Sequence, residues 1–337
     1  MSKEPGFKVF FFIGKGGVGK TTCAATFALQ VAKSKRTLIV SLDPAHNLGD
    51  VLGINLGREP TKVASNLHAL EVDFEEMIVK HLKDLTEKIK DMYGYLRVLN
   101  LDKYVDVLRH SPGIEEYATL DKIVDILKYN VSKKEYDVII FDTPPTGLTL
   151  RIMALPSISA IWVDKLMKLR EAILDRRRIV ERITGEKIRA VVGGRELEVP
   201  AERGRDPIYR ELMKMRDEVS LVNSIIKNSE VTTVVLVINP EVLPIIEAKR
   251  AFDFLNKLGI KVEYLIVNKV MSLSSARVPE EFNLRLKQEE EALALIKKYF
   301  SNLRVIKVPF FVEEPKGVDK LNILNPYLTP LVSGAVG

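Results

Sequence analysis

An apolar run that leads into a glycine-rich loop constrains this chain more than any other feature. The run Lys8–Ile13 precedes the segment Gly14-Lys15-Gly16-Gly17-Val18-Gly19-Lys20-Thr21-Thr22, which fits the pattern G-x-x-x-x-G-K-[ST]. An apolar helical pattern follows it. The order of strand, loop and helix predicts a phosphate-binding P-loop, because glycines let several N–H groups turn toward phosphate oxygens at a helix N-terminus.

The residues of this loop have separate expected roles. The whole segment from Gly14 to Thr22 is predicted to surround the phosphates of a nucleotide. Lys20 would reach the β- and γ-phosphates, and the Thr21 hydroxyl would bind Mg²⁺. Lys15 is not required by the general P-loop pattern, so it says more than the other residues about which class of P-loop protein this is.

Composition limits the class of protein. The 337 residues are 46% hydrophobic and 28% charged, as in soluble globular proteins. No uninterrupted run of 18 apolar residues occurs, and the first strand follows the N-terminus directly, so we expect a cytoplasmic protein without a transmembrane helix. Cys23 is the single cysteine, which excludes an intrachain disulfide and favours a buried core role. The net charge of +6 permits an acidic partner but does not require one.

Seven apolar runs are predicted as strands that are buried on both faces, since they are nearly continuous and do not alternate. They are 8–13, 37–43, 67–73, 136–142, 232–239, 262–268 and 303–308. Helical patterns separate most of them. This order predicts a doubly wound, mostly parallel α/β sheet with its ligands at the carboxyl ends of the strands.

Two intervals, about 74–130 and 152–230, contain helical patterns without strands. We therefore expect one P-loop domain over 1–337 with an inserted helical subdomain from these intervals. A loop is expected over 185–205, and Asp206 and Pro207 should start the next helix. The run Arg176–Arg178 is interpreted as a solvated helix face.

An apolar stripe in the second interval has two interpretations. Its members are Trp162, Leu166, Leu169, Ile173, Val180 and Ile183. Packing between helices is the favoured interpretation. The alternative is a groove for an apolar helix of a partner, with Met153, Met167, Met213 and Met215 as adaptable lining.

Two aspartates follow predicted strands and should meet at the P-loop. Asp142 is expected to hold Mg²⁺ through water, and Asp43 would then orient and polarise the attacking water. Each could instead be a turn or N-cap residue.

These segments resemble the motifs of the ArsA-type ATPases. The loop with Lys15 is similar to that family's deviant Walker A motif, Asp43–Asn47 to its switch I and Asp142–Arg151 to its switch II. Ser111–Glu116 and Val308–Gly317 resemble two further motifs of the family, the second being its adenine loop. The motifs follow in order along nearly the whole chain.

The resemblance implies an ATPase that uses ATP and Mg²⁺. Lys15 would cross a dimer interface to the partner's nucleotide, and Asp43 would activate water. Asn268 would hydrogen-bond adenine, with Pro309 and Phe310 flanking the base. Pro144, Leu148 and Lys316 depart from the residues common in the family.

The family contains ATPases that target tail-anchored membrane proteins and ATPases of arsenite-efflux pumps. The first function is favoured: a homodimer that binds transmembrane segments of its clients and delivers them under nucleotide control. It would work from the cytoplasm, peripherally at the membrane, with a membrane receptor and without a specific nucleic acid.

Several alternatives stay open. The Cys-x-x-Cys zinc clasp of many targeting ATPases is absent, so no zinc is expected. A metalloid pump would need several thiols, whereas this chain has Cys23 alone. A chromosome- or septum-positioning ATPase is the third alternative. The segment Asn325–Leu331 is not expected to form the amphipathic membrane helix that such proteins use, because it contains two prolines.

Overall fold

The computed structural model describes residues 6–45, 47–92, 109–192, 195–271 and 280–336. The chain divides into two compact units. The first combines Met1–Phe74, Ile126–Met153 and Ile225–Gly337, and the second combines Glu75–Asp125 and Ala154–Ser224. The domain organisation expected from the sequence stays a prediction.

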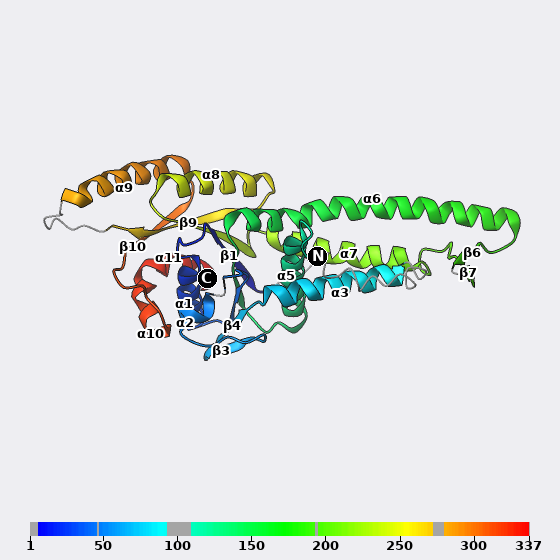
Figure 1. Cartoon of the computed structure of the whole chain (residues 1–337), viewed down its shortest axis with the longest axis horizontal. Coiled ribbons are helices and arrows are strands. Elements are labelled where there is room, and N and C mark those ends of the chain that lie inside the picture. The colour runs from blue at the N-terminus through cyan, green and yellow to red at the C-terminus, as the bar shows by residue number, and fades with distance from the viewer. Residues whose placement is uncertain (1–5, 46, 93–108, 193–194, 272–279, 337) are drawn as a thin grey trace. The chain divides into compact units, whose positions relative to one another are not determined.

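The first unit is built on an eight-stranded sheet with the order β10-β9-β8-β1-β5-β2-β4-β3. Figure 1 labels β1, β3, β4, β9 and β10 of this sheet. Its strands are β1 (Lys8–Gly14), β2 (Thr37–Ser41), β3 (Thr61–Ala64), β4 (Leu67–Glu71), β5 (Val138–Asp142), β8 (Thr232–Ile238), β9 (Val262–Val270) and β10 (Arg304–Pro309). All neighbours run parallel except β3 and β4. The predicted doubly wound α/β class is therefore confirmed, and the short antiparallel edge strand β3 is an addition.

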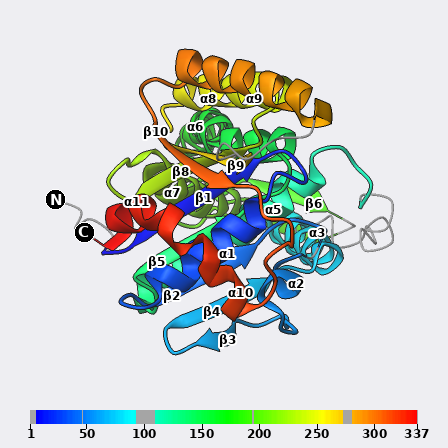
Figure 2. The ribbon, with the colours of Figure 1, turned by 90° about the vertical axis from the view of Figure 1, so that its left-hand side faces the viewer.

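The sheet is buried on both faces because alternate side chains of its strands meet different layers. On one face, the rings of Phe10 and Phe12 contact the ring of Phe27 in α1. Phe11, between them, stacks on Phe141 of β5. Helices α1, α10 and α11 cover one face and α8 and α9 the other (Figure 2). The helices of this unit are α1 (Lys20–Val31), α2 (Leu48–Leu52), α8 (Val242–Lys257), α9 (Glu280–Tyr299), α10 (Val318–Leu321) and α11 (Asn325–Val336), with a 3₁₀ turn at Asn322–Leu324.

The C-terminal segment is helical despite its prolines, and the expectation that it forms no amphipathic membrane helix stays a prediction. Helix α11 begins at Asn325, so Pro326 lies in the first turn, where a backbone N–H has no intrahelical partner. Leu328, Leu331 and Ala335 are buried against the core that contains α1. This packing outweighs the hydrogen bond that Pro330 cannot make. The apolar side of α11 is therefore buried inside the first unit.

Four helices supply most of the second unit. They are α3 (Phe74–Met92), α5 (Ile114–Lys133), α6 (Thr146–Thr184) and α7 (Pro207–Lys227). Asp206 caps α7 as expected, since its Oδ1 accepts the Tyr209 N–H at 2.7 Å. The expected loop 185–205 instead contains a hairpin of β6 (Arg189–Val192) and β7 (Arg195–Glu198). Each strand has only four residues, which is shorter than the apolar runs on which strand prediction depends.

The apolar stripe on α6 does not pack between helices, so the favoured sequence interpretation is wrong for this helix. Trp162 is 65% exposed, Leu169 60% and Ile183 79%. The packed side of α6 instead carries Val163 and Met167, which contact Leu212 and neighbouring residues of α7. By length and composition α6 could cross a membrane, although none was expected, and about a third of its most apolar stretch is buried. Such a helix also occurs in protein cores, so its exposed side chains carry more information than its length.

Candidate functional site

The predicted P-loop connects β1 to α1 at the carboxyl edge of the sheet. Gly17 and Gly19 adopt the left-handed conformation, with φ of 79° and 89°. Space also requires two glycines. A Cβ at Gly14 would lie 2.4 Å from the Val237 carbonyl oxygen, and one at Gly19 would lie 2.2 Å from Nδ2 of Asn268. The loop therefore takes its shape from glycine at these positions.

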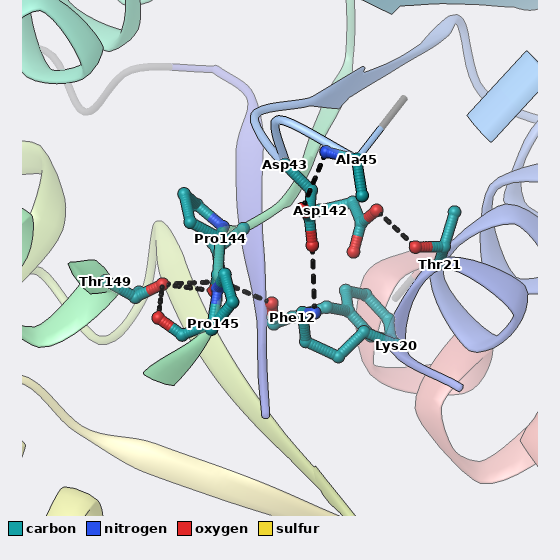
Figure 3. A network of polar contacts seen from close by, with 10 residues as sticks. Phe12, Lys20, Thr21, Asp43, Ala45, Asp142, Pro144, Pro145 and Thr149 are labelled. Carbon is teal, nitrogen blue, oxygen red and sulfur yellow. Dashed lines mark hydrogen bonds and ion pairs between the residues drawn. The ribbon is translucent and has the colours of Figure 1, made fainter. Parts of the chain in front are cut away.

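Lys20 and Asp43 meet beside this loop (Figure 3). Lys20 is the first residue of α1 and is buried, and Asp43 follows β2. The Lys20 Nζ lies 3.4 Å from Oδ2 of Asp43, whose other oxygen accepts the Ala45 N–H at 3.1 Å. A buried ammonium next to a carboxylate that is fixed at both oxygens can bind a phosphate on one side and orient a water on the other.

Thr21 and Asp142 form the second polar pair. The Thr21 hydroxyl donates to Oδ2 of Asp142 at 2.7 Å (Figure 3). Oδ1 of Asp142 is buried and has no hydrogen-bond partner among the described residues. Burial raises the pKa of Asp142 to about 6, although Lys20 and the Thr21 hydrogen bond oppose this effect. A buried carboxylate oxygen without a donor, beside a threonine hydroxyl, fits a hydrated Mg²⁺ ion.

Register explains why these groups converge. Phe12 of β1 pairs with Asp142 of β5, which in turn pairs with Ser41 of β2. The three strands therefore end at one level, and Asp43 lies just past that level. Parallel strands place their carboxyl ends at one edge, as the sequence analysis assumed.

Two residues without an expected role stabilise the segments around the site. Thr149 donates to the Pro144 carbonyl at 2.6 Å and holds the turn after Asp142 (Figure 3). Glu71, at the end of β4, accepts the Leu48 N–H at 2.9 Å where α2 begins. An acidic residue at a strand end was the available signal for Glu71, and it is the signal that identified Asp43 and Asp142.

Most predicted nucleotide contacts line one open cleft of about 670 Å³. Gly16, Gly17, Gly19, Lys20, Thr21, Thr22, Asp43, Asn268, Pro309 and Phe310 are among its lining residues. Strands β9 and β10 end beside the P-loop, so the predicted base contacts and phosphate contacts share this cleft. His46, part of the predicted switch I segment, lies outside the described residues.

The Lys15 side chain does not line this cleft. Together with Gly14 and Val18 it lines a separate small cavity that also includes Glu247 of α8. The Lys15 Nζ lies 3.2 Å from Oε1 of Glu247, and both side chains are about half exposed. Lys15 is thus not brought to the phosphate-binding side of its own loop.

Cys23 has no chemical role in this geometry. It is fully buried in α1, as expected from the sequence, and burial raises the pKa of its thiol to about 12. Among the described residues, no group of three or more His, Cys, Asp and Glu side chains is arranged to hold a metal ion.

Comparison with known proteins agrees with this geometry. The family model described as anion-transporting ATPase matches residues 7–329. Proteins named ATPase get3 from Aspergillus terreus and Aspergillus niger, and ATPase GET3 from Ajellomyces dermatitidis, are each 30% identical over 328 residues. The matches cover 95% of this chain and 91% of each relative. With a P-loop, two convergent aspartates and this similarity over almost its full length, the chain belongs to the ArsA-type anion-transporting ATPase family and is an ATP-hydrolysing enzyme.

Proposed function

We propose that this protein is a homodimeric targeting ATPase that binds the transmembrane segment of tail-anchored membrane proteins and releases it at the membrane under nucleotide control. The observation that carries the proposal is the exposed apolar face of α6. The resemblance of the sequence motifs to those of targeting ATPases supports the proposal independently. We further propose that the protein acts in the cytoplasm and meets a receptor at the membrane.

The exposed face of α6 has the chemistry of a helix-binding surface. Its members are Ile158, Ile161, Trp162, Leu166, Leu169, Ile179, Val180 and Ile183, each more than 40% exposed. Helical geometry places all of them on one side of α6, although ten residues separate Leu169 from Ile179. A row of large exposed apolar side chains on one side of a helix marks an interaction site. A client helix that is apolar all round can cover such a row without burying an unpaired polar group.

The ATP site is proposed to work as follows. Lys20 and the P-loop N–H groups hold the phosphates, and the Asn268, Pro309 and Phe310 side chains hold the base. Thr21 and, through water, Asp142 hold Mg²⁺, which would neutralise phosphate charge when bound. Asp43 orients and polarises the attacking water. The Lys20–Asp43 ion pair has to open when phosphate enters, because the ammonium then has a new anionic partner.

Lys15 is proposed to act across the dimer. The Lys15 ammonium pairs with Glu247 of its own chain, away from its own phosphate cleft. In the dimer it would place a cation on the phosphates bound by the other protomer, as an arginine finger does. Nucleotide-driven closure would then bring two copies together and complete a surface for the client.

A capture experiment tests the client. The purified protein is incubated with a fluorescent peptide of about 20 apolar residues, the length of a transmembrane helix. Binding is measured without nucleotide, with ADP and with ATP. We expect capture that depends on nucleotide, and at least a tenfold weaker affinity for the variant Trp162→Ser/Leu169→Ser, because two large apolar contacts are lost. Its ATPase activity should be unchanged.

The matched control is Leu284→Ser, which removes a 68% exposed leucine from α9 in the first unit. It should bind the peptide like the unaltered protein. A peptide of equal length with a central arginine pair should not bind. If no nucleotide state captures the apolar peptide, or if the α6 variant captures it fully, the targeting function is refuted.

A further inference from the structure

Two successive residues at the end of β9 bind two successive carbonyl groups of the P-loop. The Lys269 Nζ donates to the Gly17 carbonyl oxygen at 3.0 Å, and the Asn268 Nδ2 donates to the Val18 carbonyl oxygen at 2.8 Å. The resemblance to the ArsA-type ATPases implies that Asn268 contacts adenine, and it implies no role for Lys269. Both side chains come from a strand that lies about 250 residues further along the chain.

Peptide geometry gives these two bonds a consequence. The C=O and N–H of one trans peptide group point in opposite directions. Fixing the Gly17 carbonyl therefore directs the Val18 N–H away from Lys269, and fixing the Val18 carbonyl directs the Gly19 N–H away from Asn268. Two neighbouring N–H groups of the loop are thereby held facing the side opposite to β9's side chains. N–H groups held ready in this way bind an anion without reorganisation.

The backbone at Lys269 is strained. Its φ is 61°, in the left-handed region that residues with a Cβ disfavour. Among the described residues, Lys134 is the other non-glycine with positive φ, and it directly follows the last residue of α5, a common position for this conformation. Lys269 lies inside a strand, where no helix end explains it. Strained backbone of this kind clusters at active sites and ligand-binding loops.

A bulge accompanies the strain. Lys307 of β10 pairs with Val267 of β9, whereas Pro309 pairs with Val270. Strand β9 therefore has one more residue than β10 over this interval, and the additional length falls at Asn268 and Lys269. Bulges are rare between parallel strands, and they redirect side chains next to active sites. Here the irregularity brings both side chains onto the P-loop.

We propose that Lys269 is a positioning residue for nucleotide phosphate. It holds the P-loop in its anion-binding conformation through the Gly17 carbonyl, together with Asn268, and it links the end of β9 to the phosphate-binding loop. The proposal rests on ATP hydrolysis by this family and does not depend on a client. Failure of client capture would leave it intact.

Three variants of Lys269 separate function from folding. Lys269→Met removes the ammonium and keeps most of the side-chain length. Lys269→Arg keeps a cationic donor. Lys269→Gly also removes the donor but relieves the left-handed strain, so it should melt at the same or a higher temperature without nucleotide. The matched control is Lys261→Met, just before the other end of β9, where the lysine pairs with Glu263.

Binding is measured by titrating a fluorescent ADP and displacing it with Mg-ATP or with pyrophosphate. For Lys269→Met and Lys269→Gly we expect about tenfold weaker binding of ADP, ATP and pyrophosphate, the scale of one hydrogen bond from a charged donor. KM for ATP should rise by a similar factor and kcat should change less. Lys269→Arg should recover part of the affinity, and Lys261→Met should match the unaltered protein.

Two results would overturn the proposal. One is unchanged affinity of Lys269→Met for all three ligands. The other is weaker ADP binding with unchanged pyrophosphate binding, which would assign Lys269 to the base and not to the P-loop. If Lys269→Gly binds the three ligands more weakly but melts at an unchanged temperature, the loss of affinity is not due to unfolding.

Discussion

At the scale of single residues, the site contains charges that are buried before any nucleotide binds. Asp142 is fully buried, with one oxygen bound to Thr21 and one without a partner among the described residues. Its carboxylate is therefore held in an unfavourable environment that a hydrated cation would relieve. Such a group destabilises the nucleotide-free protein and favours binding of a ligand that neutralises it.

The pKa of Asp142 leads to a prediction about stability and pH. Its pKa is raised from 3.8 to about 6, so the folded protein binds this proton more tightly than the unfolded chain does. The free energy of unfolding should therefore fall as pH rises from about 4 to about 6 and stay low above that. Asp142→Asn should stabilise the nucleotide-free protein at pH 7 by on the order of 1–3 kcal/mol and abolish the gain in thermal stability that Mg-ATP confers.

Thermal unfolding between pH 4 and pH 7.5 measures this effect. The difference between Asp142→Asn and the unaltered protein should shrink toward pH 4, where Asp142 is protonated in the folded chain and partly protonated in the unfolded chain. Asp164→Asn, at an exposed position of α6, serves as the control. A destabilised Asp142→Asn protein at pH 7 would contradict the assignment of an unrelieved buried charge.

At the scale of elements, α6 and α7 are joined by one buried ion pair. Asp206 is completely buried, and its Oδ1 and Oδ2 accept hydrogen bonds from Arg170 of α6 at 3.0 and 2.5 Å. The same carboxylate caps α7 through the Tyr209 N–H. One side chain therefore starts a helix and attaches it to its neighbour.

Removing this carboxylate should destabilise the second unit. Asp206→Ala leaves Arg170 with no partner at Asp206 and α7 without its cap, so we expect a loss of about 2–4 kcal/mol. Trp162, the only tryptophan in the chain, lies on α6, so its fluorescence during urea unfolding reports on this unit. Glu202→Ala, which breaks the exposed pair with Arg205, should change stability by less than about 1 kcal/mol. Equal effects of the two substitutions would contradict a special role for Asp206.

At the scale of the whole molecule, the proposed action of Lys15 requires two copies. The ion pair between Lys15 and Glu247 is half exposed, and such pairs contribute little free energy. It can therefore be exchanged for a phosphate of a partner's nucleotide without a large penalty. The proposed dimer should consequently form and dissociate with the nucleotide state.

Mixing two inactive variants tests action between protomers. Lys15→Ala lacks the cation that would be supplied to the partner, and Lys20→Met cannot hold phosphate. In a mixed dimer, the Lys15→Ala chain has an intact P-loop and receives Lys15 from the other chain. Random pairing in equal amounts should then restore about a quarter of the unaltered ATPase activity. No recovery, although light scattering shows mixed dimers, would contradict the bridging role.

Residue patterns a few positions long predicted the buried strands and the loop that such patterns specify. Phe10, Phe11 and Phe12 lie in a continuous apolar run, which indicates a strand buried on both faces wherever it occurs. The acidic residues at strand ends predicted a shared site because parallel strands end at one edge. By contrast, the hairpin β6–β7 and the helix α11 were missed, since packing and pairing stabilise them against weak local preference.

The sequence by itself therefore determined the parallel sheet, the P-loop and the meeting of Asp43 and Asp142 beside it. Only the tertiary structure decided which face of α6 is left exposed, that Lys15 pairs with Glu247, and that Lys269 binds the Gly17 carbonyl. The physical reason is that a strand and its loop follow from patterns a few residues long. The partner of an individual side chain can lie far away in the sequence, as Gly17 does from Lys269 at 252 positions, and the two meet only when the sheet has formed.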